Sequence, residues 1–225
     1  NRNHMEDNLT SITLGHALFF TVIIPVIAGL VLFTLPKKSN RIKDILTIAI
    51  TVLSCYAAFK LYTSVQQAVL VGYCSIILQP FKTWLQIPGE CAQYLTLNVD
   101  AMARLIILLV SGFSLLISIY AMGYHHAEKK PKHFHSLLLL TLAASSAAIF
   151  ADNLIVLIVF WGFLGFTLYA MLSPDDEQSS AAAKKTLILI GASDGLMILG
   201  IAIIGKIAGT FSMALLDLST TNTLT

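Results

Sequence analysis

The stretch Thr186–Ile207 reads TLILIGASDGLMILGIAIIGKI, with one acidic residue, one basic residue and otherwise apolar or small uncharged side chains. A transmembrane α-helix needs about 20 predominantly apolar residues, so this stretch predicts a membrane span. Similar blocks occur near Leu14–Leu35, Ile45–Val65, Ala101–Gly123, Ser136–Phe150 and Leu154–Leu172. The sequence therefore predicts an all-α integral membrane protein with about six transmembrane helices. The fourth block is short, and only three residues separate it from the fifth, so these two predict a tight helical hairpin.

The composition agrees with a membrane protein and excludes several classes of function. Of the 225 residues, 56% are hydrophobic and only 12% are charged, whereas soluble domains carry about 25% charged residues. This balance excludes a soluble enzyme and a disordered linker, and a net charge of +2 argues against a nucleic-acid partner. Zinc and haem spacings, phosphate loops and nucleophile motifs are absent from the sequence. We therefore expect a non-catalytic membrane subunit without a cofactor or metal.

The distribution of basic residues predicts the orientation. Nine of the 14 Lys and Arg residues lie in alternate loops: Lys37, Lys38, Arg41, Lys43, Lys129, Lys130, Lys132, Lys184 and Lys185. Positively charged loops stay in the cytoplasm, so these loops are expected inside and the N-terminus outside. The chain then divides into two N-terminal helices (1–65), an extracytoplasmic connection (66–100) and a second group of helices (101–225).

The connection 66–100 differs from the other loops. Its pieces Val69–Leu78 and Gln93–Val99 have strand-like composition and predict a small β-hairpin. Cys74 and Cys91 fall in this segment, on the oxidising side, and either form a disulfide or remain two free thiols. Cys55 lies within a predicted span, where it is expected to act as a small apolar filler.

Ionisable side chains at membrane depth are costly, so each one is a candidate functional group. Asp100 and Arg104 are four positions apart on one helix face, which favours a structural ion pair over a proton pathway. Asp194 lies near the middle of the last span, and no basic residue stands three or four positions away. It is either a proton-relay group or a polar contact between helices. Gly191 and Gly195 flank it in a G-x-x-x-G pattern, which permits close helix approach.

A group of histidines precedes the fourth span. His125, His126, His133 and His135 surround the sequence K-K-P-K. Basic clusters beside a span are typical of segments that lie on the membrane surface. We therefore expect a surface segment here, with metal binding as the weaker alternative.

From the third span onward the chain resembles the antiporter-like, proton-translocating subunits of complex I, Mrp sodium/proton antiporters and membrane-bound hydrogenases. An ordered series of short motifs over roughly Leu97–Met213 carries the resemblance. The motifs are Leu97-Asn-Val-Asp100, Ser118-Ile-Tyr-Ala-Met122, Ala151-Asp-Asn-Leu154 through Val159-Phe-Trp161, Ala181-Ala-Ala-Lys-Lys185, Gly191-Ala-Ser-Asp194-Gly195 and Gly209-Thr-Phe-Ser212. The resemblance implies two inverted repeats of five helices within a bundle of about fourteen. It also implies that Asp194 and Lys185 occupy the family's acidic position and its cytoplasmic-side lysine.

The chain departs from this family in two respects. The family carries a glutamate after the tryptophan of the fifth helix, and here the sequence is Trp161-Gly162, so this acid is missing. The sequence also stops after the sixth span, before the helices that carry the family's central lysines. We therefore expect the N-terminal part of a larger protein, or a split subunit whose bundle is completed by another chain.

The leading hypothesis is a proton-translocating or energy-coupling subunit of a redox or cation/proton antiport complex. Its expected partners are other membrane subunits, the lipid bilayer and peripheral redox subunits, in the cytoplasmic (inner) membrane or an energy-transducing organellar membrane. The alternatives are a non-conducting scaffold subunit, which the missing acid at Gly162 favours, and a partner subunit of a bicarbonate or cation uptake system. The sequence leaves open whether the complex is an enzyme such as an NADH–quinone oxidoreductase or a hydrogenase.

Overall fold

The computed structural model describes residues 19–34, 40–63, 70–72, 96–124, 133–172 and 177–213. The helices are η1 (Phe19–Ile23, a π-helical turn), α2 (Ile24–Thr34), α3 (Asn40–Thr63), α6 (Ala101–Tyr124), α7 (Phe134–Phe150), α8 (Leu154–Leu172) and α9 (Glu177–Ala208). Two short strands, β1 (Leu70–Gly72) and β2 (Thr96–Asn98), complete the described elements. Cys74, Cys91, His125 and His126 lie outside the described residues.

Each predicted span corresponds to helical structure. Within the described ranges, four helices are long and apolar enough to cross a membrane: Arg41–Thr63, Ala101–Gly123, Leu154–Met171 and Ser180–Ala208. The apolar helices Phe20–Thr34 and Phe134–Phe150 are shorter. The all-helical membrane architecture predicted from the sequence is therefore confirmed.

Pro25 marks the irregular part of the first described helix. We attribute the change from the π-helical turn of η1 to the α-helix of α2 to this residue, because proline lacks the amide hydrogen that a regular helix uses. Gly29 then lets α2 approach α7 closely, since a Cβ added at this glycine would lie 2.9 Å from Cγ of Leu140.

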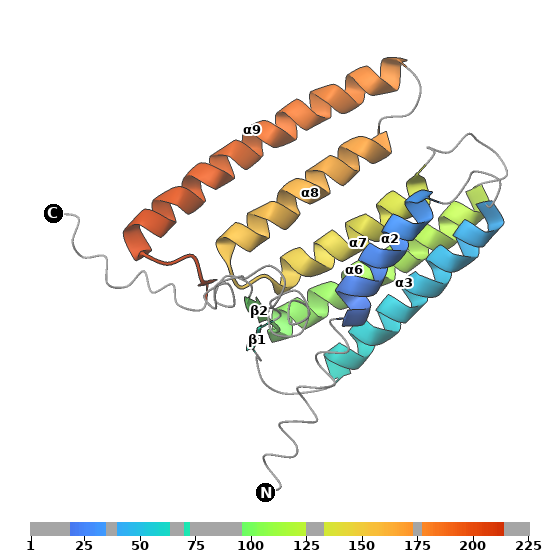
Figure 1. The fold of residues 1–225 in the computed structure, drawn as a ribbon, viewed down its shortest axis with the longest axis horizontal. Coiled ribbons are helices and arrows are strands. Elements are labelled where there is room, and N and C mark those ends of the chain that lie inside the picture. The colour runs from blue at the N-terminus through green and yellow to red at the C-terminus, as the bar shows by residue number, and fades with distance from the viewer. Residues whose placement is uncertain are drawn as a thin grey trace, which may run out of the picture.

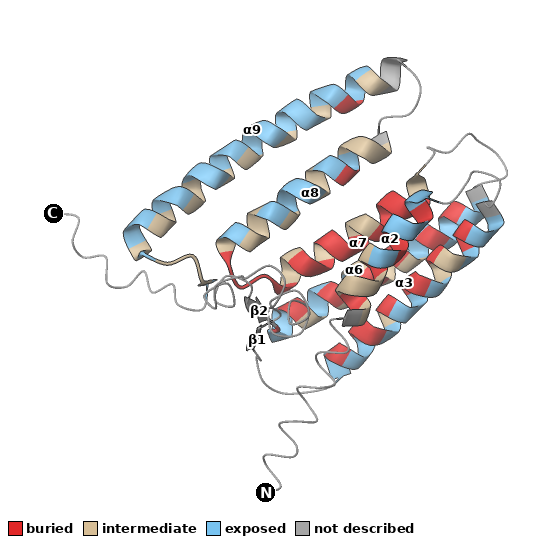
Figure 2. Ribbon diagram, in the orientation of Figure 1, coloured by how far each residue is buried: buried red, intermediate tan, exposed pale blue. Residues whose placement is uncertain are grey.

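The described helices form an open arrangement and not a bundle that is closed on all sides (Figure 1). α9, α8 and α7 lie side by side, and α2, α3 and α6 pack on the far side of α7. Burial follows this order, because α7 is largely buried whereas few residues of α8 and α9 are buried (Figure 2). The core of the described chain is therefore centred on α7.

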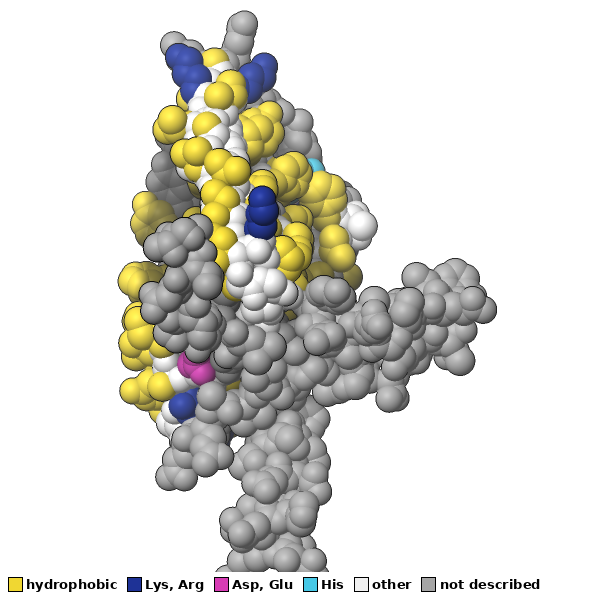
Figure 3. All heavy atoms as spheres, turned by 90° about the vertical axis from the view of Figure 1, so that its left-hand side faces the viewer, with side chains coloured by type: hydrophobic (Ala, Val, Ile, Leu, Met, Phe, Trp, Pro, Cys, Tyr) yellow, Lys and Arg dark blue, Asp and Glu magenta, His cyan; other side chains and the backbone are white. Residues whose placement is uncertain are grey.

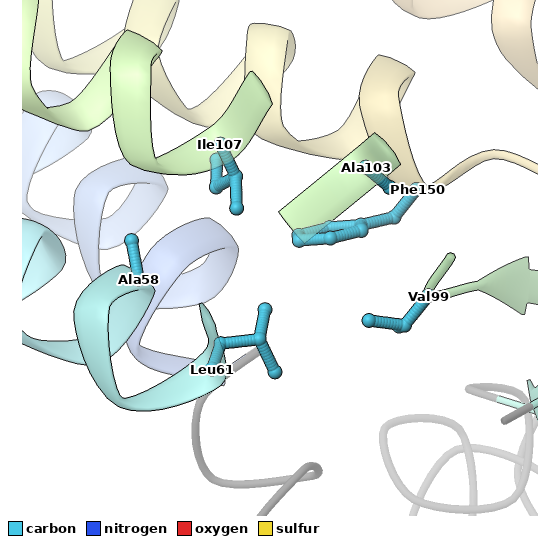
Figure 4. Close-up of a cluster of buried hydrophobic side chains, with 6 residues drawn as sticks. All are labelled: Ala58, Leu61, Val99, Ala103, Ile107 and Phe150. Atoms are coloured by element: carbon cyan, nitrogen blue, oxygen red, sulfur yellow. The ribbon is translucent and has the colours of Figure 1, made fainter. Parts of the chain in front are cut away.

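Small and aromatic residues build this core. Ala143, Ala144, Ser146 and Ala147 are buried along α7, and such small side chains let neighbouring helices approach closely. At one end of the helix Phe150 is fully buried in a cluster that joins α3, α6 and α7 (Figure 4). The other members are Ala58, Leu61, Val99, Ala103 and Ile107.

Buried hydroxyl groups connect the helices further from this cluster. Thr51 of α3 and Ser118 of α6 have their side-chain oxygens 3.1 Å apart, and Thr141 of α7 donates to Thr167 of α8 at 3.1 Å. The same hydroxyl oxygens also lie within hydrogen-bond distance of carbonyl oxygens of their own helices, and because a hydroxyl carries one hydrogen, each donates to one of these partners at a time. They therefore join helices in an environment where every polar group needs a partner.

The connection between α3 and α6 contains the strand pair. β1 and β2 are antiparallel, with Val71 opposite Leu97. Each strand lies within one of the two pieces that the sequence marked as strand-like, and β2 leads almost directly into α6.

Candidate functional site

Asp194 lies near the middle of α9 and faces α8. Its carboxylate oxygen Oδ1 accepts a hydrogen bond from the indole Nε1 of Trp161, at 3.1 Å. Asp194 is half-buried and Trp161 is 49% exposed. An aspartate in the middle of an apolar helix is thus held by a donor from the neighbouring helix and stays beside the open side of the α8–α9 pair.

A glycine of α8 makes this approach between the helices close. A Cβ added at Gly165 would lie 3.3 Å from Cγ2 of Ile190 and 3.9 Å from Oδ2 of Asp194. Because glycine has no side chain, α9 can place Ile190 and Asp194 directly against the backbone of α8. Gly165, and not the Gly191–Gly195 pair, therefore provides the close contact between these two helices.

The predicted role of Gly191 and Gly195 is corrected within the described chain. A Cβ at either position would meet no other atom within 4 Å. Both glycines are exposed on α9. The G-x-x-x-G pattern therefore faces outward, because the side of α9 on which it lies is not covered by the helices described here.

Gly162, where the family acid is missing, also faces open space. A Cβ at this position would have nothing within 4 Å. Trp161, Phe163 and Phe166, which stand near it in the sequence of α8, are exposed, and hydrophobic side chains make up much of the described surface on one face of the molecule (Figure 3). Trp161, Gly162 and Asp194 thus lie along the same incompletely covered pair of helices.

Lys185 is on the same helix as Asp194 but not beside it. The two residues are nine positions apart, which corresponds to about 13 Å along the axis and roughly half a turn around it. Lys185 is exposed near the start of α9. The structure therefore does not bring these two predicted site residues into contact.

Asp100 immediately precedes α6, and Arg104 lies in the first turn of this helix. The Nε of Arg104 donates to the main-chain oxygen of Asp100 at 3.4 Å. Asp100 is exposed and Arg104 is half-buried. This hydrogen bond is with the carbonyl group of Asp100, and an ion pair with its carboxylate stays a prediction.

The sequence analysis missed a second polar pair, between α3 and α7. Nε2 of His135 lies 2.9 Å from Oδ1 of Asp44, and both side chains are about one-tenth exposed. His133, one residue before α7, stacks on Phe33 of α2 with the ring centroids 4.1 Å apart. The prediction of a surface segment is therefore wrong for His135, because α7 already begins at Phe134 and turns this side chain inward.

Two of the motifs that carried the family resemblance meet in space. The hydroxyl of Ser212 donates to Oδ2 of the buried Asp152 at 2.8 Å. Main-chain hydrogen bonds from Leu154 to Phe211 and from Met213 to Asp152 surround this contact. The turn between α7 and α8 is thereby attached to the segment that follows α9.

Among the described residues, no group of three or more His, Cys, Asp or Glu could hold a metal ion.

Comparison with known proteins agrees with the resemblance. Residues 151–225 match the family model described as NADH:quinone oxidoreductase/Mrp antiporter, TM. Over 140 residues the chain is 30% identical to NADH-quinone oxidoreductase subunit L of Mycobacterium tuberculosis, which covers 61% of this chain and 22% of that protein. It is 32% identical over 115 residues to Na(+)/H(+) antiporter subunit A1 of Staphylococcus haemolyticus, which covers 50% of this chain and 14% of that protein.

Solved structures show the same fold. One is the membrane-bound sulfane sulfur reductase, an archaeal respiratory membrane complex, with a TM-score of 0.68 at 20% identity. The match covers 88% of this chain and 38% of the other. The Mrp complex from a Dietzia species gives a TM-score of 0.68 at 17% identity, over 90% of this chain and 20% of the other.

The chain thus spans about a fifth of the length of the curated relative with which it shares 140 aligned residues. The family match covers α8 and α9 together with the segment that follows them, and the structural matches extend to the N-terminal helices. The predicted resemblance is confirmed: in its C-terminal third the chain is similar to the NADH:quinone oxidoreductase/Mrp antiporter transmembrane family, and its fold is that of the solved antiporter-like and respiratory membrane complexes.

Proposed function

We propose that the chain is a membrane subunit of a multisubunit complex that translocates protons or cations. The names of its relatives support this assignment, since one is a subunit of a quinone oxidoreductase and another is a subunit of a sodium/proton antiporter. In this proposal it resides in the cytoplasmic membrane, or in an energy-transducing organellar membrane. Its neighbours are other membrane subunits, and peripheral redox subunits where the complex is a respiratory one.

The observation that supports a transport role most directly is the position of Asp194. It is an acidic group in the middle of an apolar helix, and Trp161 donates a hydrogen bond to one of its oxygens while its other oxygen faces Gly165. A carboxylate that is oriented by one donor but remains half-buried can accept a proton and release it again. In the proposed mechanism Asp194 performs this step.

Lys185 contributes through its charge rather than by contact. It lies on the side of α9 that the positive-inside rule assigns to the cytoplasm. It stands roughly 13 Å from Asp194 along the helix axis, so in this proposal its positive charge acts on the same pathway without a direct contact. Proton transfer to and from Asp194 then requires further groups, which the helices that complete the bundle would supply along the open side of α8 and α9.

The proposal is tested by replacing Asp194 with Asn in the intact complex. The amide oxygen of Asn can still accept the hydrogen bond from Trp161, but the group no longer carries a proton. We expect transport per assembled complex to fall about 10²-fold or more, which is the lower end of what a positioned proton-transfer group contributes. Ser193→Ala is the matched control, because that hydroxyl bonds only to the carbonyl oxygen of Ile190 in the same helix.

A scaffold role is the second candidate, and Gly162 favours it because the family's titratable group is missing there. A scaffold predicts that Asp194→Asn lowers the amount of assembled complex while transport per complex stays normal. Proton uptake into membrane vesicles, divided by the amount of complex in those vesicles, separates the two roles. Unchanged transport per complex would eliminate the relay.

A further inference from the structure

The segment after α9 folds back onto the turn between α7 and α8. Gly209 ends the helix in the left-handed region, with φ of +68°, where glycine is favoured over residues with a side chain. The ring of Phe211 then lies against Gly205, so closely that an added Cβ there would overlap it. These two glycines allow the chain to reverse within a few residues and to reach Asp152.

At the end of this reversal a buried carboxylate holds the chain. Asp152 is 2% exposed, and its Oδ2 accepts the hydrogen bond from Ser212 at 2.8 Å. Its main-chain oxygen accepts a second bond, from the amide of Met213 at 2.7 Å. We call Asp152, Phe211, Ser212 and Met213 the clasp. A buried carboxylate is costly unless it is hydrogen-bonded, so the clasp holds the segment firmly.

The clasp connects the ends of the two helices that form the Asp194 site. α8 begins at Leu154, two residues after Asp152, and α9 ends at Ala208, four residues before Ser212. On the other side of Asp194 from the clasp, Gly165 of α8 packs against the aliphatic side chain of Ile190 of α9. A glycine packed against an aliphatic side chain makes no directional bond, so this contact does little to fix the axial position of one helix along the other. The clasp therefore limits how far α9 can slide along α8.

We propose that Asp152 is a positioning residue: through Ser212 it sets the axial register of α9 on α8 and so keeps Asp194 in contact with Trp161. A slide by one helical turn, about 5.4 Å, would break the 3.1 Å hydrogen bond between them. The importance of this register for transport rests on the proposed function, but the register itself can be measured without any transport assay.

Cysteine cross-linking in native membranes that contain the full complex tests the register. Gly165→Cys with Ile190→Cys reports the observed register, because a Cβ at 165 would lie 3.3 Å from the side chain of Ile190, within disulfide reach. Gly165→Cys with Thr186→Cys reports a displacement by one turn. Single-cysteine variants control for cross-links to the native Cys55, Cys74 and Cys91.

Ser212→Ala should raise the cross-linking rate of the displaced pair about tenfold, as expected for loss of one hydrogen bond to a charged group. Ser212→Thr keeps the hydroxyl and should restore the original rates, whereas Ser193→Ala should leave them unchanged. Equal rates in Ser212→Ala and wild type would overturn the proposal. If that variant does not accumulate, Asp152→Glu takes its place, because it keeps the carboxylate and lengthens the arm; unchanged rates there would also refute a positioning role.

Transport measurements on the same variants separate the two proposals. If Asp194→Asn has no effect on transport, the relay fails while the cross-linking result for the clasp still stands. If Ser212→Ala shifts the register, transport should fall with it and recover in Ser212→Thr.

Discussion

At the scale of single residues, the scarcity of charge in the spans identifies Asp194. Burying an ionisable group in an apolar helix is costly, so its presence there indicates a function or a partner. The structure supplies one partner, Trp161, which stands 33 positions earlier in the chain. The sequence could identify the acid because its cost is a local property, but it could not identify the indole that holds it.

The glycines of α9 differ in how closely other side chains approach them, and Gly205 is the most tightly packed of them. We expect Gly205→Ala to destabilise the protein by about 1–3 kcal/mol, the usual cost of forcing extra volume into a packed site, because the ring of Phe211 must move. Gly191→Ala is the matched control, since its Cβ would meet nothing within 4 Å. The measurement is the midpoint of thermal unfolding of the purified complex, and equal midpoints for the two variants would contradict the prediction.

At the scale of elements, α7 holds the N-terminal helices together through its first turn as well as through its small residues. His135 reaches Asp44 on α3, and His133 stacks on Phe33 of α2. The sequence placed these histidines in a surface segment because of the basic residues before them. Because α7 begins at Phe134, His135 instead occupies a helical position that faces α3.

Breaking the Asp44–His135 pair should destabilise this part of the bundle. Removing one partner of a buried ion pair typically costs about 3–5 kcal/mol, and the contact between Asp44 and His135 is an ion pair when the histidine is protonated. We therefore expect Asp44→Asn to lower the thermal midpoint of the complex clearly.

Two further variants give that experiment its controls. Asp100→Asn should change the midpoint little, because Asp100 is exposed. Replacing both Asp44 and His135 by Leu should recover part of the loss, since apolar residues can substitute for a buried pair. A midpoint for Asp44→Asn equal to that of wild type would show that the pair contributes nothing to stability.

At the scale of the whole molecule, the alternation of the helices brings the basic segments to one end. α3 and α9 both begin near this end, with Arg41 and Lys43 on the first and Lys184 and Lys185 on the second. The C-terminal end of α2 and the start of α7 lie there too, as the stacking of Phe33 on His133 shows. The fold therefore agrees with the positive-inside rule, which places this end in the cytoplasm.

The predicted orientation can be tested at the two ends of α9. Ala182→Cys, exposed near the start of the helix, should react with a membrane-impermeant maleimide only after the cells are permeabilised. Met213→Cys, 37% exposed beyond the other end, should react in intact cells. The reverse pattern would invert the topology and place the N-terminus inside.

The sequence by itself determined that this protein is a helical membrane protein, where its spans lie and which acid stands alone among apolar residues. These properties follow from hydropathy and charge along a single helix, so they can be read from neighbouring residues. The tertiary structure decided what depends on the rotation and axial register of helices against one another. Trp161 beside Asp194, His135 beside Asp44 and Ser212 on Asp152 are contacts between distant segments. Local periodicity does not encode such contacts, because many registers bury an apolar face equally well.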